Sequence, residues 1–227
     1  MPTQAENRRR YDRFTLVVSE LCTDRGIRVD LRSGRGRPVD DCQDLHRHLS
    51  AMTAGRGQRR AYYTTAALIA LADPPPPRPH EPAEVPAPPE PAGTPAPHEA
   101  APEPAREPSP PAGTHDPDGA PPPDPHHHGA WARRPNLGAT LATAVLRAGY
   151  NEARTDDALH LLARLGDDQL HRRLPSLVNR LLGDGLRPDW AVLLDDLVQR
   201  GYERGPVATR WLDSFYRPLH HIPKDLL

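Results

Sequence analysis

The chain has 227 residues, with 30 acidic and 29 basic side chains, and its formal net charge at pH 7 is −1. Its two cysteines, Cys22 and Cys42, fall in different predicted helices and show no metal-ligand spacing, which argues against a disulfide framework and a zinc site. The N-terminus is polar and arginine-rich without an apolar run behind it, and no segment approaches the length of a membrane span. We therefore expect a cytoplasmic protein that has no membrane partner.

The first predicted unit is an N-terminal helical half over residues 1–73. Apolar residues recur at helical spacing from Tyr11 to Leu21. The following residues 28–38 carry four arginines and are interrupted by glycines, which suggests the end of a helix followed by a loop. The most apolar segment, Ala61–Ala72, is too rich in alanine for a strand, and we predict a buried central helix there.

The second predicted unit, residues 74–130, is a long insert of very different composition. From Pro74 to His128 it holds 22 of the 30 prolines, nine acidic residues and two basic ones, so its net charge is −7 and the rest of the chain carries +6. It has almost no bulky apolar residues, so burial could not offset the entropy of ordering it. Because proline favours extended polyproline II structure, we expect a disordered, semi-extended tether.

The third predicted unit is a C-terminal helical half over residues 131–227. Five helices are expected in it, beginning near Asn136, Thr155, Asp167, Asp189 and Pro206. Pro175 lies inside the third helix and should kink it or restart it. Trp211 and Phe215 share the apolar face of the last helix, which places them in the core. Since no segment alternates with period two, the predicted fold is all-α, with two small helical sub-bundles joined by a long disordered, proline-rich, acidic insert.

Arginine supplies nearly all of the positive charge, because Lys224 is the only lysine. Its planar guanidinium binds phosphate through two hydrogen bonds and stacks on bases. A cation is unfavourable at the N-terminal end of a helix, so Arg59 and Arg60, just before the Ala61–Ala72 segment, are more easily explained by an anionic ligand. The alternative is that exposed arginines only solvate helix faces and pair with nearby aspartates.

The sequence predicts no catalytic residue, no metal site and no cofactor. His126–His128 looks like a metal-binding tract, but it lies inside the predicted insert without partner ligands. The sequence has four acidic pairs, and three of them resemble the starts of helices. The four pairs are Asp40 and Asp41, Asp156 and Asp157, Asp167 and Asp168, and Asp195 and Asp196. A phosphate loop, a nucleophile elbow and a zinc signature are all missing from the sequence.

Six stretches together resemble the CasB family, the small subunit of the type I-E CRISPR surveillance complex Cascade. Their order over nearly all of the chain outside the insert makes the match specific, although each stretch is weak alone. They are Leu31–Pro38, Arg60–Ala70, Asn136–Leu141, Asp157–Leu174, Pro188–Leu194 and Arg210–Tyr216. The insert has no counterpart in the family and falls where the family joins its two helical halves.

The resemblance implies an all-helical subunit without catalytic activity. It implies as partners the large subunit, the repeated backbone subunit, a second copy of the chain, guide RNA and target DNA. Such a subunit stabilises the displaced non-target strand of the R-loop through a basic surface. The positions that match the family's basic residues are Arg32, Arg164, Arg172 and Arg173. Further candidates by charge alone are Arg35, Arg37, Arg59, Arg60 and Arg147.

A second hypothesis stays open beside the first. The chain could be a purely structural helical adaptor whose arginines meet acidic protein surfaces. A continuous positive surface on the folded parts would favour nucleic-acid binding, and scattered, neutralised ion pairs would favour the adaptor.

Overall fold

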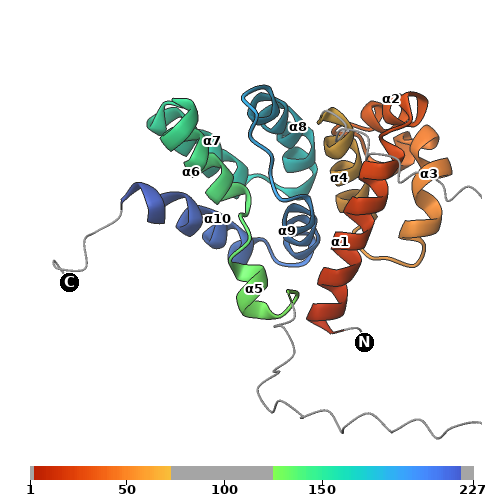
Figure 1. Ribbon diagram of the computed structural model, residues 1–227, viewed down its shortest axis with the longest axis horizontal. Coiled ribbons are helices and arrows are strands. Elements are labelled where there is room, and N and C mark those ends of the chain that lie inside the picture. The colour runs from red at the N-terminus through yellow and green to blue at the C-terminus, as the bar shows by residue number, and fades with distance from the viewer. Residues whose placement is uncertain (1–2, 73–124, 221–227) are drawn as a thin grey trace, which may run out of the picture. The chain divides into compact units, whose positions relative to one another are not determined.

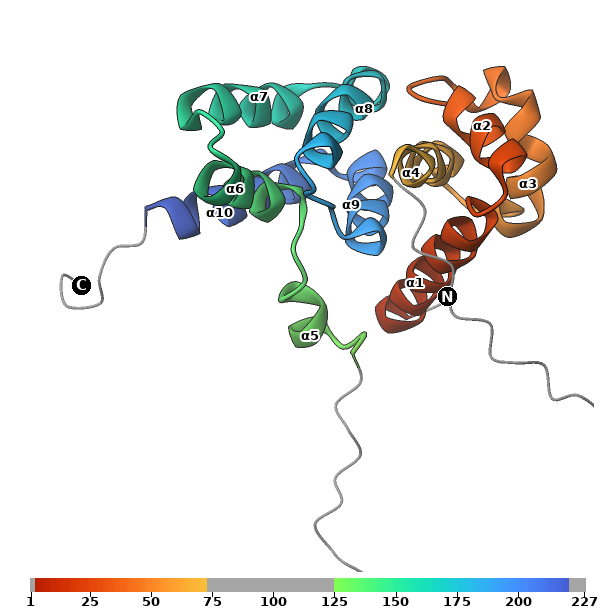
Figure 2. The same cartoon turned by 45° about the horizontal axis from the view of Figure 1, so that its top comes forward.

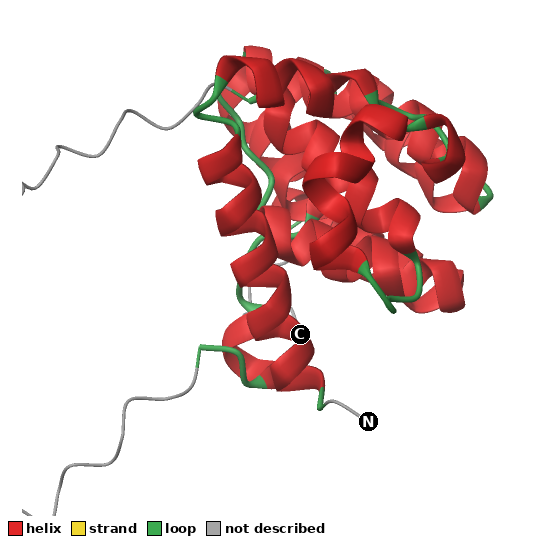
Figure 3. Ribbon diagram, turned by 90° about the vertical axis from the view of Figure 1, so that its right-hand side faces the viewer, coloured by secondary structure: helices red, strands yellow, loops and turns green. Residues whose placement is uncertain are grey.

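The computed structural model describes residues 3–72 and 125–220. Every regular element in these two ranges is a helix, which confirms the predicted all-α fold (Figure 1, Figure 3). The helices of the first range are α1 (Gln4–Leu21), α2 (Arg25–Ser33), the 3-10 helix η1 (Val39–Asp41), α3 (Gln43–Thr53) and α4 (Arg59–Leu71). Those of the second range are α5 (His128–Ala132), α6 (Leu137–Ala148), α7 (Glu152–Arg164), α8 (Asp167–Gly183), α9 (Trp190–Tyr202) and α10 (Arg204–Leu219).

The insert predicted at residues 74–130 lies outside the described residues as far as residue 124. Residues 125–130, which we assigned to the same insert, form a turn and the start of α5. Nε2 of His126 lies 2.9 Å from the Asp12 carboxylate of α1, which accepts the hydrogen bond, and the Arg8 guanidinium lies 3.3 Å from Nδ1 of His128. The histidine tract therefore packs against α1.

Side chains next to the helix ends explain where most helices begin. Asn136 caps α6 as predicted, and its Oδ1 accepts a hydrogen bond of 3.0 Å from the backbone N–H of Ala139. The start predicted for α7 at Thr155 is wrong, because Asn151 caps this helix and it begins at Glu152. Asparagine is at least as favourable as threonine at the N-terminal cap, so Asn151 caps the helix four residues before the predicted position.

Pro175 does not restart α8, which runs without interruption from Asp167 to Gly183. Proline has no N–H to donate to the carbonyl four residues earlier, which belongs to His171. Leu170, Leu174 and Val178 are fully buried on the same helix. Their burial favours one continuous helix in spite of the missing hydrogen bond.

The core surrounds α4, which lies between the α2–α3 pair and the α8–α9 pair (Figure 2). All residues from 61 to 70 of this helix are buried, as predicted for the Ala61–Ala72 segment. Trp211 and Phe215 of α10 are also fully buried, as predicted. Apolar residues from both helical parts form one hydrophobic cluster.

An ion-pair network missed by the sequence analysis joins the two helical parts. Arg134, just after α5, donates to both carboxylate oxygens of Asp12 in α1 at 2.8 Å. It also donates to both oxygens of Asp189, which caps α9, at 2.7 and 2.8 Å. The guanidinium lies 4.4 Å from the centre of the Trp131 ring. These partners are 55 and 122 residues away in sequence, so no local pattern could reveal them.

Candidate nucleic-acid interface

The turn after α2 lies directly against α8, and this contact brings predicted site residues together. Gly36 has a backbone φ of +68°, and a Cβ atom added to it would lie 3.1 Å from Cα of Arg172 and 3.4 Å from the carbonyl oxygen of His171. Only glycine combines this conformation with so close an approach. Arg35 and Arg37 flank Gly36 and are exposed, so the backbone that carries them lies next to Arg172.

A shared carboxylate connects Arg60 at the start of α4 to the same surface. Asp168 of α8 forms ion pairs with Arg60 and, at 2.9 Å, with Arg172. The hydrogen bond from Arg60, followed by the attraction of its charge, lowers the pKa of Asp168 below its ordinary value. The side chain of Arg60 is 16% exposed and that of Arg172 is 61% exposed. Arg60 therefore holds α8 in place, while Arg172 presents its charge to solvent.

The charges of two of these arginines also act on the thiol of Cys42. Burial raises the pKa of its thiol, and the charges of Arg37 and Arg60 both act in the opposite direction. One thiol thus lies within electrostatic reach of both arginines. We name the following five residues the arginine cluster: Arg60 and Arg172 share Asp168, Arg35 and Arg37 flank the glycine that touches Arg172, and Arg173 is the next exposed residue of α8.

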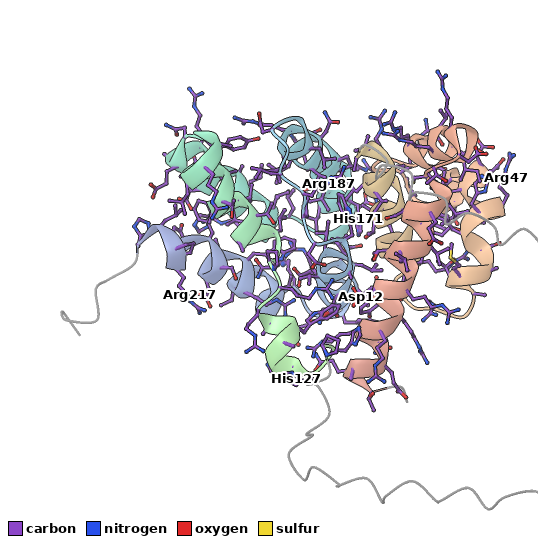
Figure 4. The ribbon with its side chains drawn as sticks, viewed as in Figure 1. Asp12, Arg47, His127, His171, Arg187 and Arg217 are labelled. Atoms are coloured by element: carbon purple, nitrogen blue, oxygen red, sulfur yellow. The ribbon has the colours of Figure 1, made fainter. Side chains whose placement is uncertain are left out.

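A buried row of polar side chains supports the cluster from below. Thr64 of α4 lies 2.7 Å from Nδ1 of His171, and Nε2 of His171 lies 3.4 Å from Asp167. His171 lies between α4 and α8 (Figure 4). A hydroxyl, an imidazole and a carboxylate in this order also occur in hydrolases. Thr64 and His171 are each 1% exposed, so a substrate cannot reach the hydroxyl, and the row serves to fix α8 against α4.

Arg32 has a structural task that the sequence did not reveal. Its Nε donates a hydrogen bond of 2.6 Å to the carbonyl oxygen of Ala70, in the last turn of α4. Arg28 donates to the carbonyl oxygens of Ala70 and Ala72 at 3.1 and 2.7 Å. Helices leave such carbonyls without partners, and cations near them are favourable. Arg32 therefore lies at the C-terminal end of α4, whereas Arg60 of the arginine cluster lies at its N-terminal end.

The other predicted arginines are placed apart from the cluster or at its edge. Arg59 folds back on Tyr63, whose hydroxyl accepts a hydrogen bond of 3.2 Å. Arg164 is exposed at the end of α7, three residues before α8, and its carbonyl oxygen accepts a hydrogen bond of 3.1 Å from Arg204. Arg147 is exposed in the last turn of α6, and no contact joins it to the cluster among the described residues. Arg204 is an exposed neighbour that our prediction missed.

Arg200 is a buried arginine that the sequence analysis also missed. It is 4% exposed, and its Nη2 donates to the carbonyl oxygens of Leu162, Ala163 and Leu165 at the end of α7. A signal existed, because Arg200 follows Leu193 and Leu197 at helical spacing on a buried face. Its charge made a surface position the simpler assumption.

Comparison with known proteins gives a consistent result. A family model described as CRISPR-associated protein Cse2 matches residues 28–216. This chain belongs to the Cse2 family. A solved chain from a "CRISPR RNA-guided surveillance complex" is 25% identical, with a TM-score of 0.66, and the alignment covers 97% of this chain and 99% of that one. A second, from a "CRISPR RNA-guided surveillance complex, pre-nicking", is 26% identical with a TM-score of 0.65 and the same coverage. No curated protein matches.

The Cse2 match agrees with the resemblance seen in the sequence and covers the whole arginine cluster. It begins at residue 28 and therefore leaves out α1. Within residues 3–72 and 125–220, no group of three histidine, cysteine or carboxylate side chains is placed to hold a metal ion. No helix in these ranges has both the length and the apolar character needed to cross a membrane.

Proposed function

We propose that this Cse2 protein is a non-catalytic subunit of a CRISPR RNA-guided surveillance complex. The similar solved chains come from complexes with that description, and the alignments cover 99% of those chains. The partners that we propose are the large subunit, the repeated backbone subunit, a second copy of this chain, guide RNA and target DNA. Thr64 and His171, which form the hydroxyl–imidazole–carboxylate row with Asp167, are buried, and this supports a structural rather than a catalytic role for the row.

The arginine cluster is the observation that supports nucleic-acid binding. Arg35, Arg37, Arg172 and Arg173 are exposed, and they come from a turn and a helix that Gly36 holds in contact. Arginines on such a surface bind phosphate without reading sequence, as a subunit that accepts any target must do. We propose that the cluster holds the displaced DNA strand. Since an R-loop exchanges duplexes of nearly equal stability, a few phosphate contacts suffice to favour it.

Asp168 does not prevent this binding. Its ion pair with Arg172 is exposed on both sides, and solvent screens such pairs so that they contribute little to stability. A phosphate can therefore replace Asp168 as the partner of Arg172 at little cost. Arg60, whose side chain is largely covered, keeps its pair with Asp168 and stays a positioning residue.

One observation favours the adaptor as a second candidate. Arg28, Arg32 and Arg60 are all engaged within the chain, which reduces the positive charge available to a nucleic acid. In that case the exposed arginines would meet acidic surfaces of protein subunits.

A salt titration of single-stranded DNA affinity distinguishes the two candidates. The test variant replaces Arg35, Arg37, Arg172 and Arg173 with alanine. A matched control replaces four exposed arginines elsewhere, at positions Arg25, Arg133, Arg154 and Arg217. Each lost phosphate contact should reduce the slope of log affinity against log salt by about 0.7. The test variant should lose affinity and slope, and the control should lose little. Equal losses in both variants would favour the adaptor.

A further inference from the structure

A second basic site lies away from the arginine cluster. A hollow of about 490 Å³ opens between α1, the end of α3 and the start of α4. It is lined by three arginines, Arg10, Arg13 and Arg56, and by apolar groups of Phe14, Val17, Met52 and Tyr62. We call it the basic hollow. Four of its lining residues belong to α1, which precedes the range that the Cse2 family model matches.

The charge of the basic hollow is not balanced within it. None of the described residues that line it is acidic, and no carboxylate of the described ranges lies within ion-pair distance of Arg10, Arg13 or Arg56. Arg56 is held in place, because its Nε donates a hydrogen bond of 2.9 Å to the carbonyl oxygen of Met52. Two carboxylates lie nearby on α1: Asp12 accepts hydrogen bonds from Arg134, and Glu6 accepts hydrogen bonds from Thr3, which lower its pKa together with a smaller effect of the Arg10 charge. Three cations that converge on one hollow are complementary to an anionic ligand.

The lining indicates which kind of anion fits. Nucleobases stack on open aromatic faces. Phe14 and Tyr62 are only 6% and 5% exposed, and the Arg56 guanidinium already lies 5.7 Å from the centre of the Tyr62 ring. Val17 and Met52 are half-buried and provide an aliphatic surface that accommodates an apolar side chain. An anion with an aliphatic anchor suits this lining better than a nucleotide does.

We propose that the basic hollow docks an acidic peptide segment of a protein partner. One apolar side chain of that segment enters between Val17 and Met52, and carboxylates on either side of it meet Arg10, Arg13 and Arg56. Helix α1 contributes both kinds of contact, because Arg10, Arg13 and Val17 follow one another at helical spacing on its outer face. This site does not depend on the arginine cluster.

The test measures binding of a fluorescein-labelled probe peptide, Glu-Glu-Leu-Leu-Glu-Glu, to the full chain by fluorescence anisotropy. Two control peptides separate the contributions: Glu-Glu-Gly-Gly-Glu-Glu lacks the anchor, and Lys-Lys-Leu-Leu-Lys-Lys reverses the charge. The double variant Arg10→Glu/Arg13→Glu changes two exposed side chains, and Arg133→Glu/Arg217→Glu is its matched control. Arg217 lies on α10, away from the hollow (Figure 4).

The expected result is binding of the probe peptide and much weaker binding of both control peptides. Arg10→Glu/Arg13→Glu should weaken binding about tenfold or more, which corresponds to about 1.4 kcal/mol, and the matched control should change it less than about twofold. Val17→Lys should also weaken binding although it adds a positive charge, since it removes part of the aliphatic lining. Met52→Gln tests the same point if Val17→Lys lowers the melting temperature.

Three results would overturn the proposal. The first is equal binding of the glycine peptide, and the second is tighter binding by the Val17→Lys variant. Either result would show that only charge attracts the peptide and that no apolar side chain binds between Val17 and Met52. The third is displacement of the probe by an oligothymidylate, together with weaker binding of this oligothymidylate to the Arg10→Glu/Arg13→Glu variant. That result would make the basic hollow a nucleic-acid site.

Discussion

Replacing Gly36 with alanine should damage the contact that assembles the arginine cluster. The left-handed conformation at φ +68° costs an L-residue about 1–2 kcal/mol. The new Cβ atom would also lie 3.1 Å from the backbone of Arg172, which cannot rotate away as a side chain could. Overpacking of this kind costs about 1–3 kcal/mol more, or is relieved when the turn moves away from α8.

Gly55 provides a matched control for the Gly36→Ala variant. Its φ is +67°, almost the same, but nothing lies within 4 Å of an added Cβ atom. Gly55→Ala should therefore lose only about 1–2 kcal/mol of stability, the cost of the left-handed conformation, and should bind single-stranded DNA as the wild type does. The difference between the two variants isolates the contact with α8.

Thermal unfolding and DNA affinity are measured on both variants. For a chain of this size, each kcal/mol lowers the melting temperature by about 2–4 °C. Gly36→Ala should melt below Gly55→Ala and should bind single-stranded DNA severalfold more weakly, because Arg35 and Arg37 move away from Arg172. If both variants melt alike and bind DNA alike, the packing of Gly36 against α8 does not organise the surface.

Three further changes test other parts of the structure. Burial raises the pKa of Asp196 from 3.8 to about 6, so its carboxyl binds a proton more readily in the folded chain than in the unfolded chain. The free energy of unfolding should therefore fall as the pH rises from 3.8 to about 6. Asp196→Asn should remove this dependence on pH. If the free energies of unfolding of the variant and the wild type differ by the same amount at every pH in this range, the prediction is contradicted. Arg200→Met should cost about 3 kcal/mol in chemical denaturation, because one charged donor serves three carbonyl oxygens; a loss below 1 kcal/mol would be inconsistent with those bonds. Deleting residues 78–123, which carry most of the insert's negative charge, should strengthen DNA binding at low salt; unchanged affinity would show that this charge does not compete.

The helices and the core could be predicted from sequence because their signals are local. The apolar run from Ala61 to Ala72 and the spacing of Trp211 and Phe215 follow from the helical repeat alone. Asn136 could be recognised as a cap for the same reason. The start of α7 was predicted wrongly at Thr155, because Asn151, a suitable cap four residues earlier, begins the helix.

The arrangement of the arginines could not be predicted, because it depends on contacts between distant segments. A cation is unfavourable at the N-terminal end of α4, where Arg60 lies, but Asp168 pairs with it from 108 residues away. The predicted helix end within residues 28–38 is present, because α2 ends at Ser33, but the hydrogen bond from Arg32 to the end of α4 depends on a residue 38 positions away. Charge and spacing identified which residues were candidates, and packing decided which of them share a surface.

The most direct test of the proposed function is R-loop formation by the complete surveillance complex. The complex is assembled with wild-type chain or with the variant that replaces Arg35, Arg37, Arg172 and Arg173, and assembly is checked first by gel filtration. We predict that the variant assembles normally but leaves the displaced DNA strand more open to a single-strand nuclease and gives R-loops that dissociate faster. An assembled variant complex with the same strand protection and the same R-loop lifetime as wild type would contradict the proposed role of the arginine cluster.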